Sequence, residues 1–367
     1  MGGSREFSLL KTEKPTKPIL ICGNEAIGEA AIQAGCLAYF GYPITPQNEL
    51  TAYMASRMPE EGRVFIQSES ELAAINMVFG ASALGVRAMT SSSSPGISLK
   101  QEGISYLAGC ELPAVIVNMS RGGPGLGNIG PAQSDYFQST RGGGHGDYRT
   151  PVLAGASVQE LADVTFLAFD LADRYRTPVL ILGDGILGQM MGPVLIKHPE
   201  PTRIPPKDWI LGGAAGRPPR VIKSLFLGSG ELDAHNRKLQ ERYRIIQDTE
   251  VRHEEFKTDD AELIMVAYGI TARLCREVVR NIRREGHKVG LLRPITLWPF
   301  PSGRIAELCS TAKKFLSVEM SYGQMVDDVR LAVNGRRPVD FFGNGGGEIL
   351  TVEEIEGYTV KLSLDLS

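Results

Sequence analysis

Cysteine is scarce in this sequence, and its spacing excludes the usual metal sites. The 367 residues contain five cysteines, and no two of them form a CxxC pair. Iron–sulfur clusters and structural zinc are normally held by such closely spaced thiolates. Each cysteine lies in an apolar stretch, which predicts buried, unreactive thiols. We therefore expect no metal on this chain; the five are Cys22, Cys36, Cys110, Cys275 and Cys309.

Long apolar runs and an excess of one charge are also missing. No stretch approaches the ~18 consecutive apolar residues of a membrane span. Residues 1–17 are polar and lack the apolar core of a secretory signal. The formal net charge is −3, which gives no general attraction to nucleic acid or to an anionic membrane. The sequence predicts a cytoplasmic protein.

Two glycine signals for phosphate groups are incomplete. The turn at 23–28 does not match GxGxxG, and Tyr42 and Pro43 stand where a dinucleotide-binding fold places an acid. Gly183-Asp184-Gly185 resembles the start of the GDG…N motif that holds magnesium and diphosphate in thiamine-diphosphate enzymes. No asparagine follows between Gly185 and Lys223. We therefore interpret Asp184 as the end of a strand.

What the sequence does contain is a repeated alternation of strands and helices. Short apolar runs at 18–23, 37–41, 64–67, 87–90, 114–118 and 178–182 predict strands, and the runs at 18–23 and 64–67 are expected to be buried. Helical periodicity lies between them, at 25–37, 71–84, 98–107 and 158–175. Continuous apolar strands joined by helices predict an α/β fold with a mostly parallel sheet covered on both faces.

The composition changes after the last of these strands. Residues 197–220 are rich in proline and predict a linker, and 232–257 are dense in charge and predict a solvated helix. A second, smaller α/β unit begins near Glu262. We expect an N-terminal extension at 1–17, a first domain at 18–196, a linker and charged helical segment at 197–260, and a second domain at 261–367.

Two acids, Glu69 and Glu71, lie where a strand gives way to an apolar helix. In thiamine catalysis a carboxylate in an apolar setting binds N1′ of the aminopyrimidine ring, where a low dielectric strengthens the bond. The alternative is a helix cap, with Ser68 as N-cap and Glu71 as its partner three residues later. The local sequence does not decide between these two interpretations.

The ordered set of motifs resembles the 2-oxoacid:ferredoxin oxidoreductase family, over about Ile19 to Gly343. Each motif is weak alone, but together they keep the family's order. Many relatives read Ser-Gly-Pro-Gly at 93–96, where this chain has a second serine. The resembling stretches are Tyr42-Pro43-Ile44-Thr45-Pro46, Gln67 to Ala74 with Gly80-Ala81, Ser93-Ser94-Pro95-Gly96, Arg121-Gly122-Gly123-Pro124, and Val318-Glu319-Met320 with Gly323-Gln324.

The resemblance implies a divided active site. This chain type supplies the thiamine-diphosphate pyrimidine-binding domain and a smaller α/β transketolase-C-terminal-like domain. A diphosphate-binding beta-type subunit and gamma-type and ferredoxin-like iron–sulfur subunits supply Mg²⁺ and [4Fe-4S] clusters. The implied reaction is the oxidative decarboxylation of a 2-oxoacid with coenzyme A to acyl-CoA and CO₂, with ferredoxin taking the electrons.

The resemblance also assigns site residues. Glu71 matches the catalytic glutamate at N1′ better than Glu69 does, because its distance to Gly80 fits. Ser94, Pro95 and Gly96 match the cofactor loop. Arg121 matches the arginine that binds the substrate carboxylate; without the resemblance it would be a surface arginine in a glycine-rich turn. Thr45 matches a threonine near the 2-oxo group and also suits a helix cap.

The glycine-rich segment 141–147 is open to two interpretations. It predicts a mobile lid that carries His145 to the substrate, or a flexible contact with another subunit. The motif variants favour 2-oxoisovalerate or 2-oxoglutarate as substrate, with a slight preference for branched chains. Arg141 or His145 in the pocket would favour 2-oxoglutarate, whose second carboxylate needs a partner.

Two other functions fit parts of the sequence. A self-sufficient thiamine decarboxylase or a nucleotide-dependent enzyme would need its own phosphate motif, which we do not find. A non-catalytic assembly subunit would keep the fold without using Glu71 or Arg121.

Overall fold

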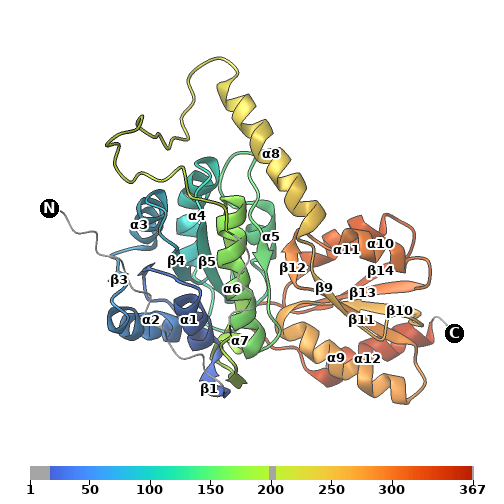
Figure 1. The fold of residues 1–367 in the computed structure, drawn as a ribbon. Helices are drawn as coiled ribbons and strands as arrows, with labels where there is room; N and C mark the ends of the chain where they lie inside the picture. Colours follow the sequence, from blue (N-terminus) through green and yellow to red (C-terminus); the bar gives the residue numbers. More distant parts are fainter. Residues whose placement is uncertain (1–16, 198–203, 366–367) are drawn as a thin grey trace.

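The computed structural model describes residues 17–197 and 204–365, which form two α/β units side by side (Figure 1). The predicted N-terminal extension, apart from Lys17, and residues 198–203 of the predicted linker lie outside the described residues. In the described part of the chain, no helix is long and apolar enough to cross a membrane.

The first unit is built on a seven-stranded sheet in the order β12-β6-β7-β5-β4-β2-β3. All neighbours are parallel except β12, which pairs antiparallel with β6. The strands β2, β4, β5 and β7 are buried along their whole length, as the continuous apolar runs predict. The strands are β2 (Ala38–Gly41), β3 (Val64–Gln67), β4 (Ala88–Ser92), β5 (Ala114–Ser120), β6 (Val152–Leu153), β7 (Pro178–Asp184) and β12 (Thr296–Trp298).

Helices cover both faces of this sheet, and each face has its own apolar core. One core contains side chains of α1 (Gly23–Gln33), α2 (Asn48–Glu60), α6 (Val158–Tyr175) and the short α7 (Gly185–Gln189). The other contains side chains of α3 (Glu71–Ala83), α4 (Ser94–Gly109), α5 (Tyr136–Arg141) and the protruding α8 (Glu231–Thr249). The predicted α/β fold with a covered parallel sheet is confirmed.

Two strands that we expected to be buried are largely exposed, so these expectations are wrong. The strand β1 (Ile19–Cys22) lies outside the main sheet, in an antiparallel pair with β8 (Met191–Val194), and Leu20 is 69% exposed. The strand β3 is an edge strand with Val64 and Ile66 exposed. An apolar run records strand propensity, but burial depends on the place that the strand takes in the fold.

The second unit contains a five-stranded sheet in the order β14-β13-β10-β11-β9. Only β9 is antiparallel to its neighbour, and it lies in the segment that we expected to be a linker and charged helix. The elements are β9 (His253–Phe256), β10 (Leu263–Val266), β11 (Val289–Pro294), β13 (Lys314–Glu319), β14 (Val339–Gly343), α9 (Gly269–Arg284), α10 (Ser302–Leu308), α11 (Met325–Val333) and α12 (Val352–Leu364).

The two units are joined by a strand and by buried hydrogen bonds. The strand β12 follows β11 in the chain but completes the sheet of the first unit. Gln133 of the first unit donates from Nε2 to the Tyr268 carbonyl, at 2.9 Å, and accepts at Oε1 from the Thr271 hydroxyl, at 2.8 Å, and the Met320 amide, at 3.0 Å. The units therefore share a polar, water-excluded contact.

Candidate functional site

The candidate residues gather at the carboxyl ends of the parallel strands. Thr45 lies in the turn after β2, Ser93 follows β4, and Arg121 follows β5. The strands β2, β4 and β5 are neighbours in the sheet, so their carboxyl ends lie along one edge. This edge is where open α/β sheets bind ligands.

Glu71 begins the helix α3 directly after the edge strand. Ser70 is the N-cap of this helix, and its hydroxyl accepts from the Ala73 amide at 3.2 Å. The predicted N-cap, Ser68, is wrong: its hydroxyl donates to the carbonyls of Gly41, at 3.1 Å, and Ser70, at 2.9 Å. Glu71 is 6% exposed, whereas Glu69 is exposed to solvent. Only Glu71 therefore presents a buried carboxylate.

The Glu71 carboxylate lies against the first turn of α4, at Gly96. A Cβ built on Gly96 would come 2.4 Å from Glu71 Oε1 and 2.0 Å from Ser92 Oγ, both impossible contacts. Within residues 17–197 and 204–365, the Glu71 carboxylate accepts no hydrogen bond, and the buried Ser92 hydroxyl has no partner. A buried hydroxyl is normally satisfied, so the Ser92 oxygen is available to a polar ligand, as is the unbonded Glu71 carboxylate beside it.

Ser94 connects the start of α4 to the end of β5. Its hydroxyl donates to Asp135 Oδ2, at 2.7 Å, and accepts from the Arg121 amide, at 2.9 Å; its own amide donates to Asn118 Oδ1, at 3.2 Å. Burial raises the pKa of Asp135, and the hydrogen bonds from Ser94 and Asn118 oppose this rise. The backbone of Ser94 does not have a positive φ, so the position does not require the glycine of many relatives. Pro95 follows in the first turn of the helix.

Arg121 and Thr45 meet at the strand ends. Arg121 is 6% exposed; its Nη1 donates to the Thr45 carbonyl and its Nη2 to the Leu126 carbonyl, both at 3.0 Å. Arg121 Nε is buried and unpaired. The Thr45 hydroxyl accepts from Asn48 Nδ2 at 3.2 Å, but the N-cap of α2 is Gln47, so Thr45 does not cap that helix. The Arg121 guanidinium is thus held in place by two backbone carbonyls, and its Nε–H has no acceptor in the described residues.

His145 lies apart from these residues. It is exposed, its ring meets Tyr106 edge-on at 6.0 Å between centroids, and its carbonyl accepts from the Ser105 hydroxyl at 2.6 Å. Because an α-helix rises about 1.5 Å per residue, Ser105 is about 16 Å along α4 from Ser94. The structure does not bring His145 to Arg121 within this chain.

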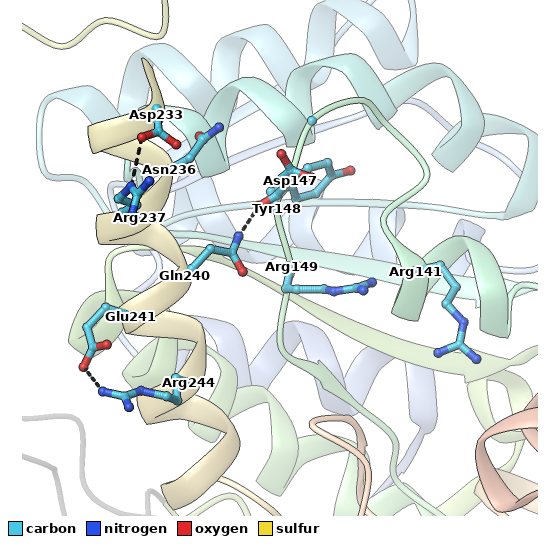
Figure 2. Close-up of a pocket in the computed structure, with 11 residues that line it drawn as sticks. Arg141, Asp147, Tyr148, Arg149, Asp233, Asn236, Arg237, Gln240, Glu241 and Arg244 are labelled. Atoms are coloured by element: carbon cyan, nitrogen blue, oxygen red, sulfur yellow. Dashed lines mark hydrogen bonds and ion pairs between the residues drawn. The ribbon is translucent and has the colours of Figure 1, made fainter. Parts of the chain in front are cut away.

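Arg141 also points elsewhere. Its guanidinium forms an ion pair with Asp328 of the second unit at 2.9 Å and lies over the Phe137 ring. It borders an open pocket of about 760 Å³ between α8 and residues 141–149, shown in Figure 2. Other charges of this pocket are paired along α8, Asp233 with Arg237 and Glu241 with Arg244. The pocket is separate from the strand ends.

Sequence reasoning missed one charged residue of the strand-end group. Lys100 on α4 is fully buried, and its ammonium donates to the Ser91 carbonyl at 3.5 Å. Burial lowers the pKa of Lys100 to about 8, and the charge of Glu71 opposes this change. The available signal was a lysine one helical turn after Gly96, on a face that otherwise carries Gly103, Ile104 and Leu107.

All five cysteines are free and buried, which confirms the prediction of buried thiols. Burial also raises the pKa of Cys36 to about 12, so this thiol is unreactive.

The covered parallel sheet, with a buried, unpaired glutamate at its carboxyl edge and a second, smaller α/β unit, defines a thiamine-diphosphate-binding type of protein. The family model "Pyruvate flavodoxin/ferredoxin oxidoreductase, thiamine diP-bdg" matches residues 29–255, and "Pyruvate:ferredoxin oxidoreductase core domain II" matches residues 261–355. The chain belongs to the 2-oxoacid:ferredoxin oxidoreductase family, as an alpha-type subunit.

Similar proteins bear the names of two enzymes. The ketoisovalerate oxidoreductase subunit VorB of Methanothermobacter thermautotrophicus is 52% identical, over 92% of this chain and 95% of that protein. The 2-oxoglutarate synthase subunit KorA of the same organism is 35% identical, over 95% of this chain and 100% of that protein.

A solved structure extends the likeness to the fold. It is the 2-oxoglutarate:ferredoxin oxidoreductase from Magnetococcus marinus with 2-oxoglutarate, coenzyme A and succinyl-CoA bound, with a TM-score of 0.85 and 28% identity. The match covers 95% of this chain and 65% of the Magnetococcus chain. The proteins VorB and KorA are named as subunits of multi-subunit enzymes, and this chain is one such subunit.

Proposed function

We propose that this chain is the pyrimidine-binding, substrate-reading subunit of a coenzyme A-acylating 2-oxoacid:ferredoxin oxidoreductase. The complex oxidatively decarboxylates a branched-chain 2-oxoacid such as 2-oxoisovalerate to acyl-CoA and CO₂, and ferredoxin accepts the electrons. The observation that carries the proposal is the carboxylate of Glu71, a residue only 6% exposed, which faces Gly96 without a hydrogen bond in the described residues.

The site fits one half of thiamine diphosphate. The Glu71 carboxylate and the buried Ser92 hydroxyl suit the polar edge of a pyrimidine ring, and the backbone at Ser94, Pro95 and Gly96 borders them. The GDG…N motif is incomplete here, so the diphosphate, Mg²⁺ and the [4Fe-4S] clusters are assigned to beta-type, gamma-type and ferredoxin-like partner subunits. A domain boundary near residue 260 agrees with the two matched family regions.

Three residues of this chain have distinct roles in the proposal: Glu71, Arg121 and Thr45. When bound, thiamine diphosphate supplies a carbon nucleophile for the 2-oxo group and accepts the electron pair that decarboxylation leaves. Glu71 is the catalytic residue and holds a proton at N1′ of the pyrimidine. Arg121, through its free Nε–H, anchors the substrate carboxylate by a charge-assisted hydrogen bond. The Thr45 hydroxyl positions the 2-oxo oxygen.

Two observations favour a branched-chain substrate over 2-oxoglutarate. The relative named for ketoisovalerate shares more of this sequence than the one named for 2-oxoglutarate. The distal carboxylate of 2-oxoglutarate would need a cationic partner, but Arg141 pairs with Asp328 and His145 lies at the other end of α4. Both 2-oxoisovalerate and 2-oxoglutarate are therefore included in the experiment that tests the substrate.

The decisive experiment uses the complex purified with its natural partners. Reduction of an electron acceptor is measured with 2-oxoisovalerate or 2-oxoglutarate, with and without coenzyme A. Glu71→Gln is expected to reduce kcat by about 10²-fold or more, because a proton transfer is impaired. The control Glu69→Gln, at an exposed acid, is expected to match wild type. Arg121→Ala is expected to raise the KM for the 2-oxoacid.

Three outcomes would contradict the proposal. Full activity of Glu71→Gln and Arg121→Ala would indicate a non-catalytic assembly subunit. Turnover by the chain without partners would indicate a self-sufficient decarboxylase. A higher kcat/KM for 2-oxoglutarate than for 2-oxoisovalerate would overturn the substrate choice alone.

A further inference from the structure

A lysine is buried in the helix that borders the proposed pyrimidine pocket. Lys100 has no exposed surface, although lysine is among the residues least often found inside proteins. In the part of the chain that the structure describes, its ammonium donates one hydrogen bond, to the Ser91 carbonyl, at the long distance of 3.5 Å. A buried cation with so little compensation destabilises the fold, so its presence calls for another explanation.

The position of Lys100 relates it to Glu71. Residues four apart on a helix lie on the same face, so Lys100 follows Gly96 by one turn of α4. Gly96 is the residue against which the Glu71 carboxylate lies. Ser91 and Ser92, the last residues of β4, contact both: the Ser91 carbonyl accepts from Lys100, and the Ser92 hydroxyl lies at Gly96 beside Glu71. The ammonium and the carboxylate therefore lie at the same buried strand end.

We propose that Lys100 is a positioning residue of the pyrimidine pocket, whose ammonium stabilises the ionised carboxylate of Glu71. This inference rests on the proposed function and adds a residue to its site. Lys100 acts through Glu71 and does not itself contact the cofactor or the substrate.

The physical reason is the low polarity of the site. A carboxyl group in dry surroundings favours its neutral form, unless a nearby positive charge offsets the loss of hydration. With its ammonium at the same strand end, Lys100 would favour the ionised form of the Glu71 carboxylate, and Glu71 would then hold the shared proton on N1′ of a bound pyrimidine. Thiamine diphosphate would supply a 4′-amino group, which a proton held at N1′ would make more acidic. The number of protons is unchanged; only their distribution shifts.

Other titratable groups near α4 have their own partners. Glu71 is the acid on α3 whose charge acts on Lys100. The remaining groups are Asp135 with Ser94 and Asn118, Arg121 with the Thr45 and Leu126 carbonyls, Asp184 with the amides of Ile186 and Leu187, Tyr39 with Ser91 and Thr51, Tyr148 with the Gly144 amide, and Glu102 with Tyr106 on the exposed face.

The competing explanation is a purely structural lysine. Two substitutions separate the two roles. Lys100→Met retains the length and the apolar stem and removes the charge. Lys100→Gln retains a hydrogen-bond donor for the Ser91 carbonyl but carries no charge. A structural role predicts that Lys100→Gln retains more activity than Lys100→Met. The electrostatic role predicts that both variants lose the same activity, because neither carries the charge.

The test uses the complete complex with its partners and three readouts. These are the pH profile of kcat with 2-oxoisovalerate, the circular dichroism band of the imino form of the bound aminopyrimidine, and the Tm of the complex. Both variants are expected to lower kcat at neutral pH at least about tenfold, in the range of lost proton-transfer assistance. The acidic limb moves to higher pH, the imino band weakens, Tm is unchanged or higher, and the KM for the 2-oxoacid changes little.

Lys207→Met is the matched control, because Lys207 pairs with Asp173 and the Gly85 carbonyl, away from the strand ends. An unshifted acidic limb and imino band in folded Lys100 variants would overturn the proposal. A fall in Tm that accounts for the loss of activity, with Gln better than Met, would also overturn it in favour of a structural role. If Glu71→Gln has wild-type activity, the proposed function itself fails, whatever the Lys100 variants do.

Discussion

At the scale of single residues, the candidate site depends on one missing side chain. The Glu71 carboxylate and the Ser92 hydroxyl occupy the space where any other residue at Gly96 would place its Cβ. The backbone of Gly96 has no positive φ, so the glycine is required here by close approach and not by conformation.

We therefore expect Gly96→Ala to displace the Glu71 carboxylate. The variant complex should bind thiamine diphosphate more weakly and lose most of its turnover, as measured by cofactor titration and by the acceptor-reduction assay. The control is Gly80→Ala in α3, where an added Cβ meets nothing within 4 Å. That change should raise the free energy of unfolding by about 0.5–1 kcal/mol, through helix propensity, and leave turnover unchanged. Equal activity of both variants would show that Gly96 is not required for close approach.

At the scale of elements, the helix starts and strand ends do most of the positioning. Asp184 ends β7 and caps α7, because its Oδ1 accepts from the amides of Ile186, at 3.0 Å, and Leu187, at 3.1 Å. The interpretation of this aspartate as the end of a strand is confirmed. Burial raises its pKa to about 6, against the opposing effect of these hydrogen bonds.

This raised pKa predicts a pH-dependent contribution to stability. Between pH 4 and 6 the folded chain binds more protons at Asp184 than the unfolded chain does, so its contribution falls as the pH rises through this window. Asp184→Asn retains the capping acceptor and removes the charge. At pH 7 it should unfold with a free energy higher by on the order of 3 kcal/mol, and at pH 4 it should match wild type. Denaturant unfolding at both pH values checks this; parallel curves would contradict it.

At the scale of the whole molecule, polar contacts join the two units at their junction. The Gln133 side chain is 2% exposed and satisfies three groups of the second unit. Nearby, the Tyr136 hydroxyl donates to Asp328 at 2.5 Å, and Gln324 Nε2 donates to the Ser134 carbonyl at 2.6 Å. These contacts place the second unit beside the strand-end site.

Gln133→Leu should weaken this junction. The change keeps a similar volume but leaves the Thr271 hydroxyl, the Met320 amide and the Tyr268 carbonyl without their partner, at roughly 1–3 kcal/mol for each unsatisfied group. We expect a loss of roughly 3 kcal/mol or more in the free energy of unfolding, measured in urea. The control Gln138→Leu removes one exposed bond to Ser98 and a buried Oε1 that has no partner among the described residues, so it should lose no more than about 0.5 kcal/mol relative to wild type. A loss no greater than that of the control would mean that the junction tolerates unpaired groups.

Many of the helices and strands could be predicted from local sequence. Periodicity placed the helix at 158–175 where α6 is found, because Ser157 caps its start and an apolar stripe faces the sheet. The same reasoning predicted a solvated helix at residues 253–256 and was wrong there. The backbone forms the edge strand β9, and the charged side chains of Glu254 and Glu255 pair with arginines of neighbouring elements. The pairing arginines, Arg276 and Arg304, lie 22 and 49 residues from their partners, beyond the reach of local periodicity.

The sequence by itself determined the order of the longer strands and helices, the family and the residue types at several strand ends, because these depend on short-range periodicity and on motifs. Only the tertiary structure decided that Glu71 is buried and Glu69 is not, and that Lys100 lies at the same strand end. It also decided that His145 contacts the far end of α4, and that β12 completes the first sheet. Burial and proximity arise when distant segments pack together, and no short stretch of sequence carries that information.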